Sequence, residues 1–201
     1  MKTNLSIKLI LNLCTLILSG CHSLKVTDDS ISKDSVDPNV FVINRTFKAK
    51  PKLVFEAWVN PNRFMRWLGP KGASMNFIKA DVKEGGTSLW SMTTADGKTK
   101  FGTLHYKIIN SSDLIVYIQN FSDKSGNLIK APFSQSYPDK LLTTVRFYPD
   151  GSNRTKVVVR WEVFGIASDA ERQTFQSLKQ VMQIGWSDSF DKLDSILLEG
   201  K

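Results

Sequence analysis

Alternating hydrophobic and polar positions predict seven β-strands in this chain. The first strand covers residues 40–47, where β-branched side chains are frequent. The turn pairs Asp96-Gly97 and Asp150-Gly151 separate later strands, and such pairs favour antiparallel hairpins. The six later strands are expected at residues 74–82, 87–94, 99–109, 114–121, 141–148 and 155–164.

Apolar residues spaced three and four positions apart predict helices both before and after these six strands in the sequence. Pro51 suits the first turn of one short helix, and Pro61 separates it from a second that ends near Leu68. Ser168 and Glu171 form a capping-box pair at the start of a third helix. Its apolar stripe continues for about thirty residues, roughly 45 Å at 1.5 Å per residue. We therefore expect one long C-terminal helix that lies against a broad sheet.

The first 38 residues differ from the rest of the chain. Residues 1–20 have a basic start, a short apolar stretch and small residues before Cys21, which is typical of a secretory signal peptide. The segment LSGC, residues 18–21, resembles the lipobox of bacterial lipoproteins, which implies that Cys21 carries the lipid. Residues 21–38 are rich in Ser and Asp and predict a flexible tether to a domain at residues 39–201. Because His22 is not an aspartate, we favour the outer membrane, facing the periplasm.

The net charge of +8 changes this picture little. A basic chain raises the possibility of nucleic-acid binding. However, Lys and Arg are scattered along the sequence, and the predicted envelope location argues against nucleic acid. We interpret the charge as solvated surface that favours anionic headgroups of a nearby membrane.

Several motifs together resemble the SRPBCC (START-like) superfamily. They are Arg45, the pattern A-x-P-x-x-V-F-x-A-W at residues 49–58, Trp67 with Pro70, Gly85-Gly86 and Gly185-Trp186. More narrowly, residues 39–198 resemble the branch named after the C-terminal domain of heat shock protein 90 ATPase activators. The sequence INSSD before Leu114 departs from the proline-rich turn usual there.

The resemblance implies an α+β helix-grip fold. In this fold a curved antiparallel sheet of about six to seven strands surrounds a long C-terminal helix, with two short helices after the first strand. A cavity commonly remains between sheet and helix. An interior glycine costs a helix roughly 1 kcal/mol. We therefore expect Gly185 to allow a close helix–sheet approach that turns Trp186 toward the sheet, although both residues would also suit a simple packed core.

Residues suited to catalysis or metal binding are sparse. His22 lies in the tether, and His105 stands alone on a strand without a ligand cluster at metal spacing. Glu162 is on the polar side of its strand next to Arg160, which favours an ion pair over a general acid. The sequence predicts no catalytic residue, no metal site and no cofactor.

Aromatic and apolar side chains are the strongest candidates for function. Strand parity and helical spacing predict that one group of them converges between the sheet and the last helix, where they would form either a filled core or an apolar pocket with Gln119 as a polar contact. The predicted function is binding of an apolar small molecule or lipid by an envelope lipoprotein. Two alternatives stay open, a helix-grip enzyme of cyclase or hydrolase type and a chaperone-activator-like protein-binding domain. The candidate ligand-binding residues are Trp90, Tyr117, Trp161, Met182 and Trp186.

Overall fold

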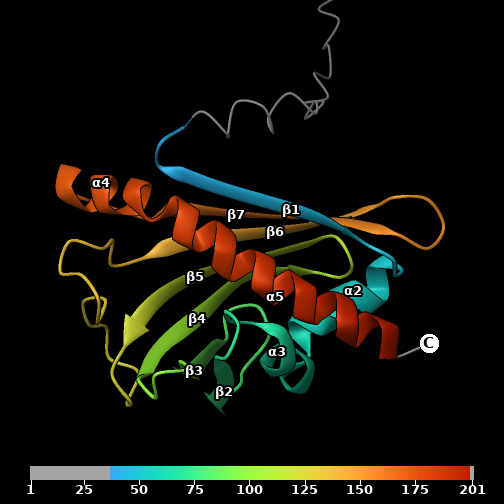
Figure 1. Ribbon diagram of the computed structural model, residues 1–201, viewed down its shortest axis with the longest axis horizontal. Helices are drawn as coiled ribbons and strands as arrows, with labels where there is room; N and C mark the ends of the chain where they lie inside the picture. The colour runs from blue at the N-terminus through green and yellow to red at the C-terminus, as the bar shows by residue number, and fades with distance from the viewer. Residues whose placement is uncertain (1–36, 200–201) are drawn as a thin grey trace, which may run out of the picture.

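A computed structural model describes residues 37–199 of the chain, and these form one antiparallel sheet with helices packed on one side (Figure 1). The predicted signal peptide, Cys21 and most of the tether lie outside the described residues. The strand order is β1-β7-β6-β5-β4-β3-β2, so the first strand of the chain pairs with the last strand. The strands are β1 (Val40–Phe47), β2 (Ser74–Lys79), β3 (Thr87–Thr93), β4 (Thr99–Asn110), β5 (Leu114–Ser122), β6 (Leu141–Pro149) and β7 (Thr155–Val163).

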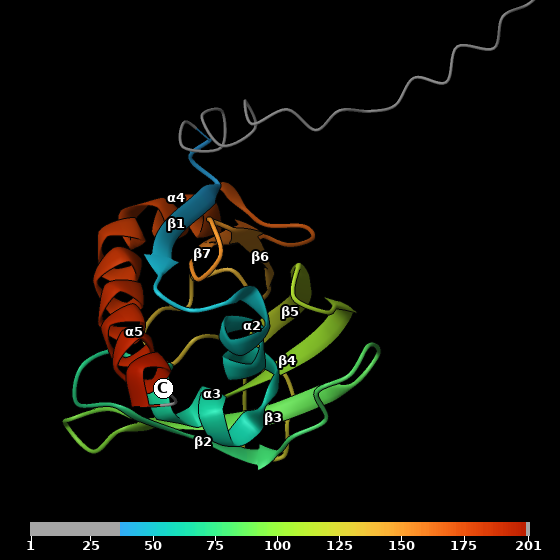
Figure 2. The same ribbon diagram turned by 90° about the vertical axis from the view of Figure 1, so that its right-hand side faces the viewer.

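Within residues 37–199 four helices accompany the sheet, and Figure 2 shows α5 lying along it while α2 and α3 close one end. Pro51 and Pro61 each occupy a first helical turn, where a missing N–H costs nothing. The helices are α2 (Pro51–Val59), α3 (Pro61–Trp67), α4 (Asp169–Ser177) and α5 (Lys179–Glu199). This arrangement confirms the helix-grip fold. None of the helices between residues 37 and 199 is long and apolar enough to cross a bilayer.

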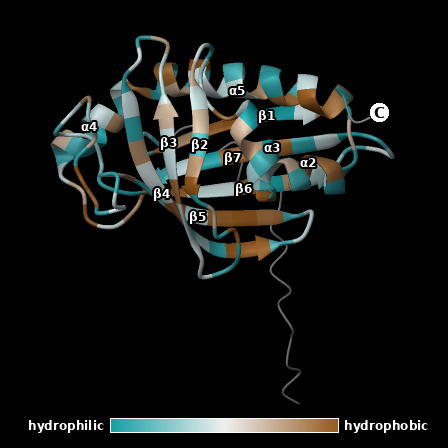
Figure 3. Cartoon of the chain, turned by 90° about the horizontal axis from the view of Figure 1, so that it is seen from below, coloured by the Kyte–Doolittle hydropathy of each residue, from teal (hydrophilic) through white to brown (hydrophobic). Residues whose placement is uncertain are grey.

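The hydrophobic core lies between the sheet and the helices. Figure 3 shows that α5 alternates between hydrophobic and hydrophilic stretches along its length, as expected for a helix buried on one side. The large apolar side chains on the buried side of α5 are those of Met182, Trp186, Phe190, Leu193 and Leu197. On the outer edge of the sheet, Arg45 of β1 pairs with two carboxylates of α5, which fixes the helix against the first strand.

The C-terminal helix is interrupted, which corrects the prediction of one continuous helix. The capping box of Ser168 and Glu171 is present, but α4 ends at Ser177 and α5 begins after Leu178 (Figure 2). Hydroxyls of Thr174 and Ser177 donate to carbonyl oxygens of the preceding turn. Such back-bonding bends helices, because it competes with the regular ladder. The apolar spacing continued across the bend and hid it.

Gly185 does not mediate a close approach, so that prediction is wrong. A Cβ atom built on Gly185 would have no other atom within 4 Å, apart from its own chain neighbours and the helix backbone. A side chain does approach the backbone closely at Gly102 of β4, within the sheet. There a Cβ would lie 2.2 Å from Cζ2 of Trp90 and 2.5 Å from the carbonyl oxygen of Asn120. Gly102 therefore allows an indole ring to lie directly on the sheet backbone.

Candidate functional site

A cavity of about 230 Å³ lies between the sheet and α5. Strands β2 to β7 form its floor and sides, and α5 forms its roof. Two loops, α3–β2 and β5–β6, complete the wall. The described residues that line it are mostly apolar or aromatic; they are Leu68, Gly69, Pro70, Met75, Trp90, Met92, Leu104, Tyr117, Gln119, Asn120, Phe121, Tyr137, Pro138, Asp139, Leu141, Trp161, Met182, Gly185, Trp186 and Ser189.

All five residues predicted as ligand-binding line this single cavity. Trp90 comes from β3, Tyr117 from β5, Trp161 from β7, and Met182 and Trp186 from α5. They converge because the strand residues belong to the inner face of the sheet, while the two α5 residues lie about one helical turn apart and share a side. The polar residue Gln119 also lines the cavity.

Two of the floor residues share one row across the sheet. In the ladders, Tyr117 is opposite Thr143, and Thr143 is opposite Trp161. Side chains directly opposite each other in antiparallel strands stand on the same face of the sheet, with Cβ atoms about 4.5–5.5 Å apart. Tyr117 and Trp161 are therefore held in fixed positions by backbone pairing.

Trp90 forms one side wall, next to a small aromatic cluster. Its ring lies over Gly102 and packs against Phe121 with ring centroids 6.1 Å apart. Phe121 in turn contacts Phe133 and Tyr137 of the β5–β6 loop at 5.5 and 6.1 Å. The loop is thereby attached to the sheet through aromatic contacts.

The roof combines large and small residues of α5. Met182, Gly185, Trp186 and Ser189 are spaced so that they share one side of the helix, and all four line the cavity. The hydroxyl of Ser189 accepts a hydrogen bond from the backbone N–H of Gly69 at 3.0 Å. This contact joins α5 to the α3–β2 loop. Gly185 occupies part of the roof without filling any of the space below it.

Sequence reasoning missed the contribution of the β5–β6 loop. Tyr137 and Pro138 are buried and line the cavity, although they lie in an irregular stretch between strands. Lys130 anchors this loop, because its ammonium lies 2.8 Å from a carboxylate oxygen of Asp139 and 2.8 Å from one of Glu171 in α4. The sequence shows only an aromatic residue followed by a proline at this place, Tyr137-Pro138, and does not reveal that the pair is buried.

The cavity wall is close to electrically neutral. Among the described lining residues only Asp139 carries a charge, and Lys130 pairs with it. Burial raises the pKa of the Tyr117 and Tyr137 hydroxyls, so both stay protonated at neutral pH. The wall therefore supplies hydrogen-bond donors but no free base.

His105 and Glu162, the two described residues that the sequence analysis considered for metal binding or catalysis, do not line the cavity. The Nδ1 atom of His105 hydrogen-bonds the hydroxyl of Thr87 at 2.9 Å. Glu162 forms an ion pair with Arg160, as its position on the strand predicted. In residues 37–199 no group of three or more His, Cys, Asp or Glu side chains is arranged to hold a metal ion.

A family model described as "Activator of Hsp90 ATPase homolog 1-like protein" matches residues 48–198. The chain belongs to this family. The match covers both short helices, all later strands and the C-terminal helices, and so confirms the resemblance seen in the motifs. Among curated proteins no sequence matches this chain.

Solved structures confirm the fold of this family member. A protein from Arthrobacter aurescens superposes with a TM-score of 0.67 at 25% identity, covering 81% of this chain and 87% of that one. Protein Ms6760 from Mycobacterium smegmatis has a TM-score of 0.67 at 17% identity, with 82% and 93% covered. The AHSA1 protein from Silicibacter pomeroyi has a TM-score of 0.61 at 13% identity, with 81% and 99% covered.

Proposed function

We propose that this domain binds an apolar small molecule, or the apolar part of a lipid, between the sheet and α5 without transforming it. The observation that carries the proposal is the cavity of about 230 Å³ with a mainly apolar wall. Typical ligand pockets measure roughly 300–1,000 Å³ and are lined by apolar and aromatic side chains with a few polar contacts. The cavity lies just below that range, so we expect a single ring system or acyl chain rather than a whole phospholipid.

Binding without turnover fits the chemistry of the wall. General acid–base catalysis needs a group that exchanges protons near the working pH. The protonated Tyr117 and Tyr137 do not meet that need, and Asp139 is held by Lys130 at the outer part of the β5–β6 loop. The lining residues are thus suited to enclosing a ligand.

Filling the cavity tests this proposal directly. Gly185→Leu adds a side chain on the roof, where a Cβ meets no neighbour within 4 Å. We expect this variant to stay folded and to bind the apolar fluorophore N-phenyl-1-naphthylamine at least tenfold more weakly than the native protein. Binding is measured by the saturable rise in dye fluorescence and by quenching of tryptophan emission.

Two controls separate occlusion from other effects. Gly185→Ala makes the same helix-favouring change but adds only one carbon atom. Gln183→Leu places the same side chain on the exposed side of α5. Both variants should bind the dye like the native protein. Absence of saturable binding to the native protein would contradict the proposed function.

We further propose that the protein is a lipoprotein anchored to the envelope membrane through Cys21, with the outer membrane favoured. The support is the segment LSGC after an apolar stretch of signal-peptide length. Cys21→Ala should accumulate as unprocessed precursor, detected by its larger mass and by loss of acyl labelling in a bacterial host. Normal processing and labelling of Cys21→Ala would rule this anchor out.

A further inference from the structure

Two tryptophans that line the cavity have buried indole N–H groups without a hydrogen-bond acceptor. These groups belong to Trp161 of β7 and Trp186 of α5, and neither Nε1 atom has a partner among the described residues. The two rings lie edge to face, with centroids 5.5 Å apart and planes at 69°. Buried donors are nearly always paired in folded proteins, and leaving one unpaired is unfavourable. Two such donors side by side need an explanation.

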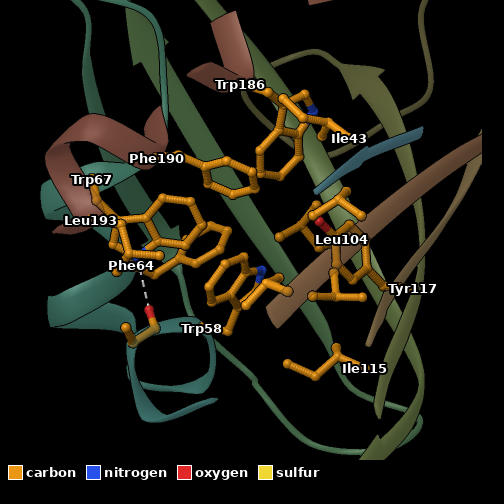
Figure 4. Packing of buried hydrophobic residues seen from close by; sticks show 14 of the residues in the cluster. Ile43, Trp58, Phe64, Trp67, Leu104, Ile115, Tyr117, Trp186, Phe190 and Leu193 are labelled. Atoms are coloured by element: carbon orange, nitrogen blue, oxygen red, sulfur yellow. Dashed lines mark hydrogen bonds between the residues drawn. The ribbon is translucent and has the colours of Figure 1, made fainter. Parts of the chain in front are cut away.

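The position of these donors is fixed from both sides of the cavity. Trp161 belongs to the sheet row that also carries Thr143 and Tyr117, whereas Trp186 comes down from α5. Figure 4 shows Trp186 on the helix side and Tyr117 with Leu104 on the sheet side of the same space. Trp161 and Trp186 both line the cavity, so a molecule that fills it would contact both indole rings.

The charge of the wall restricts what such a molecule can be. An ionised carboxylate or phosphate group loses much of its hydration free energy in an apolar cavity unless a cationic side chain pairs with it. No Lys, Arg or His lines the cavity in the part of the chain that the structure describes. A cationic ligand would find only Asp139, which Lys130 already neutralises. A neutral ligand meets neither difficulty.

We propose that the cavity takes a neutral molecule with an apolar body and one hydrogen-bond acceptor, such as a ketone, ester or ether oxygen, that accepts from Trp161 and Trp186. This inference rests on the proposed binding function and specifies the chemical class of its ligand. The acceptor would pair with donors that the protein leaves without a partner, and the apolar body would fill the empty volume beside them.

A third tryptophan offers a matched control. The indole N–H of Trp58 also has no acceptor among residues 37–199, but Trp58 does not line the cavity. Its ring packs edge to face against Phe147 with centroids 5.3 Å apart. Replacing Trp58 by Phe therefore removes the same N–H group in the core, away from any ligand.

The test compares nonane with 2-nonanone, which differ by one carbonyl oxygen, in the native protein and three variants. Each compound displaces N-phenyl-1-naphthylamine, and the ratio of the dissociation constants, ketone over alkane, is the quantity measured. We expect Trp161→Phe and Trp186→Phe to raise this ratio by about 3- to 10-fold, the value of one neutral hydrogen bond. Trp58→Phe should leave it unchanged. Because the ratio is taken within each variant, general loss of packing cancels.

Nonanoate provides a second arm that needs no variant. At pH 7.5 it is ionised, and we expect it to displace the dye at least tenfold less effectively than 2-nonanone. Equal displacement by nonanoate would overturn the inference of a neutral ligand. An unchanged ratio in both Trp161→Phe and Trp186→Phe, with dye and nonane still bound, would overturn the acceptor site and leave the binding function intact. Failure of the dye and nonane to bind the native protein would contradict both the acceptor site and the proposed binding function.

Discussion

The space between the sheet and α5 has two halves that differ in how they are filled. Near α2 and α3, the rings of Trp58, Trp67 and Phe190 pack together, with centroids of the first two 4.4 Å apart (Figure 4). Trp67 is fully buried, and its indole donates to the carbonyl oxygen of Ala57 at 2.9 Å. Near Trp161 and Trp186, the same sheet and the same helix leave about 230 Å³ unoccupied.

Side-chain size along α5 explains much of the difference. The helix carries Phe190, Leu193 and Leu197 over the packed half, but Gly185 and Ser189 among the residues over the cavity. The two short helices also supply the large rings of Trp58, Phe64 and Trp67, none of which lines the cavity. The cavity therefore depends on small residues at a few positions of α5, whereas larger side chains fill the rest of the space between sheet and helix.

The largest expected effect is a loss of stability in the packed half. Trp67→Ala should lower the free energy of unfolding by about 3–5 kcal/mol, because it opens a cavity in a region that cannot relax. Trp161→Ala should cost less, about 1–2 kcal/mol, because its ring already borders empty space and the removed atoms had fewer neighbours. Urea unfolding of both variants measures the two values. Equal losses would show that the halves are packed alike.

The two glycines of the cavity half should respond in opposite directions. Gly102→Ala should destabilise the protein by about 1–3 kcal/mol, because its Cβ collides with Trp90 and with the backbone of Asn120. Gly185→Ala should stabilise it by up to about 1 kcal/mol, because the helix gains a better helix former in open space. Thermal unfolding of the pair checks the signs. A destabilised Gly185→Ala protein would mean that the roof of the cavity is closed.

The smallest expected effect concerns the anchor of the β5–β6 loop beside the cavity. Lys130, together with the N–H and hydroxyl of Ser168, lowers the pKa of Glu171 from 4.5 to about 2. A lowered pKa stabilises the folded state above the unfolded value, and this contribution is lost as the pH falls from about 4.5 through 2. Glu171→Gln should therefore cost at most about 1 kcal/mol at pH 7, since the pair lies near the surface. Its difference from the native protein should shrink below pH 4.5 in acid unfolding curves, and a pH-independent difference would contradict this.

The sequence by itself determined the order and type of nearly all elements. Period-two alternation in β7, the prolines that begin α2 and α3, and the capping box at Ser168 are local signals, because each depends on residues close together in the chain. Strand parity and helical spacing also grouped the five candidate cavity residues. For Tyr117 parity left the inward side open, because residues 114–121 are apolar on both faces of the strand.

Only the tertiary structure decided which side chains fill the space between the sheet and α5. Whether a Cβ fits at Gly185 or at Gly102 depends on atoms of other elements, and the residue type carries no information about them. The cavity itself is the difference between the volume that the sheet and α5 enclose and the volume of the side chains from many strands and loops. The position of Tyr137 at its wall likewise depends on a loop held by Lys130 to a helix 41 residues further along the chain. Such long-range contacts have no periodicity in the sequence, which is why the pattern predicted the framework but could not predict the space within it.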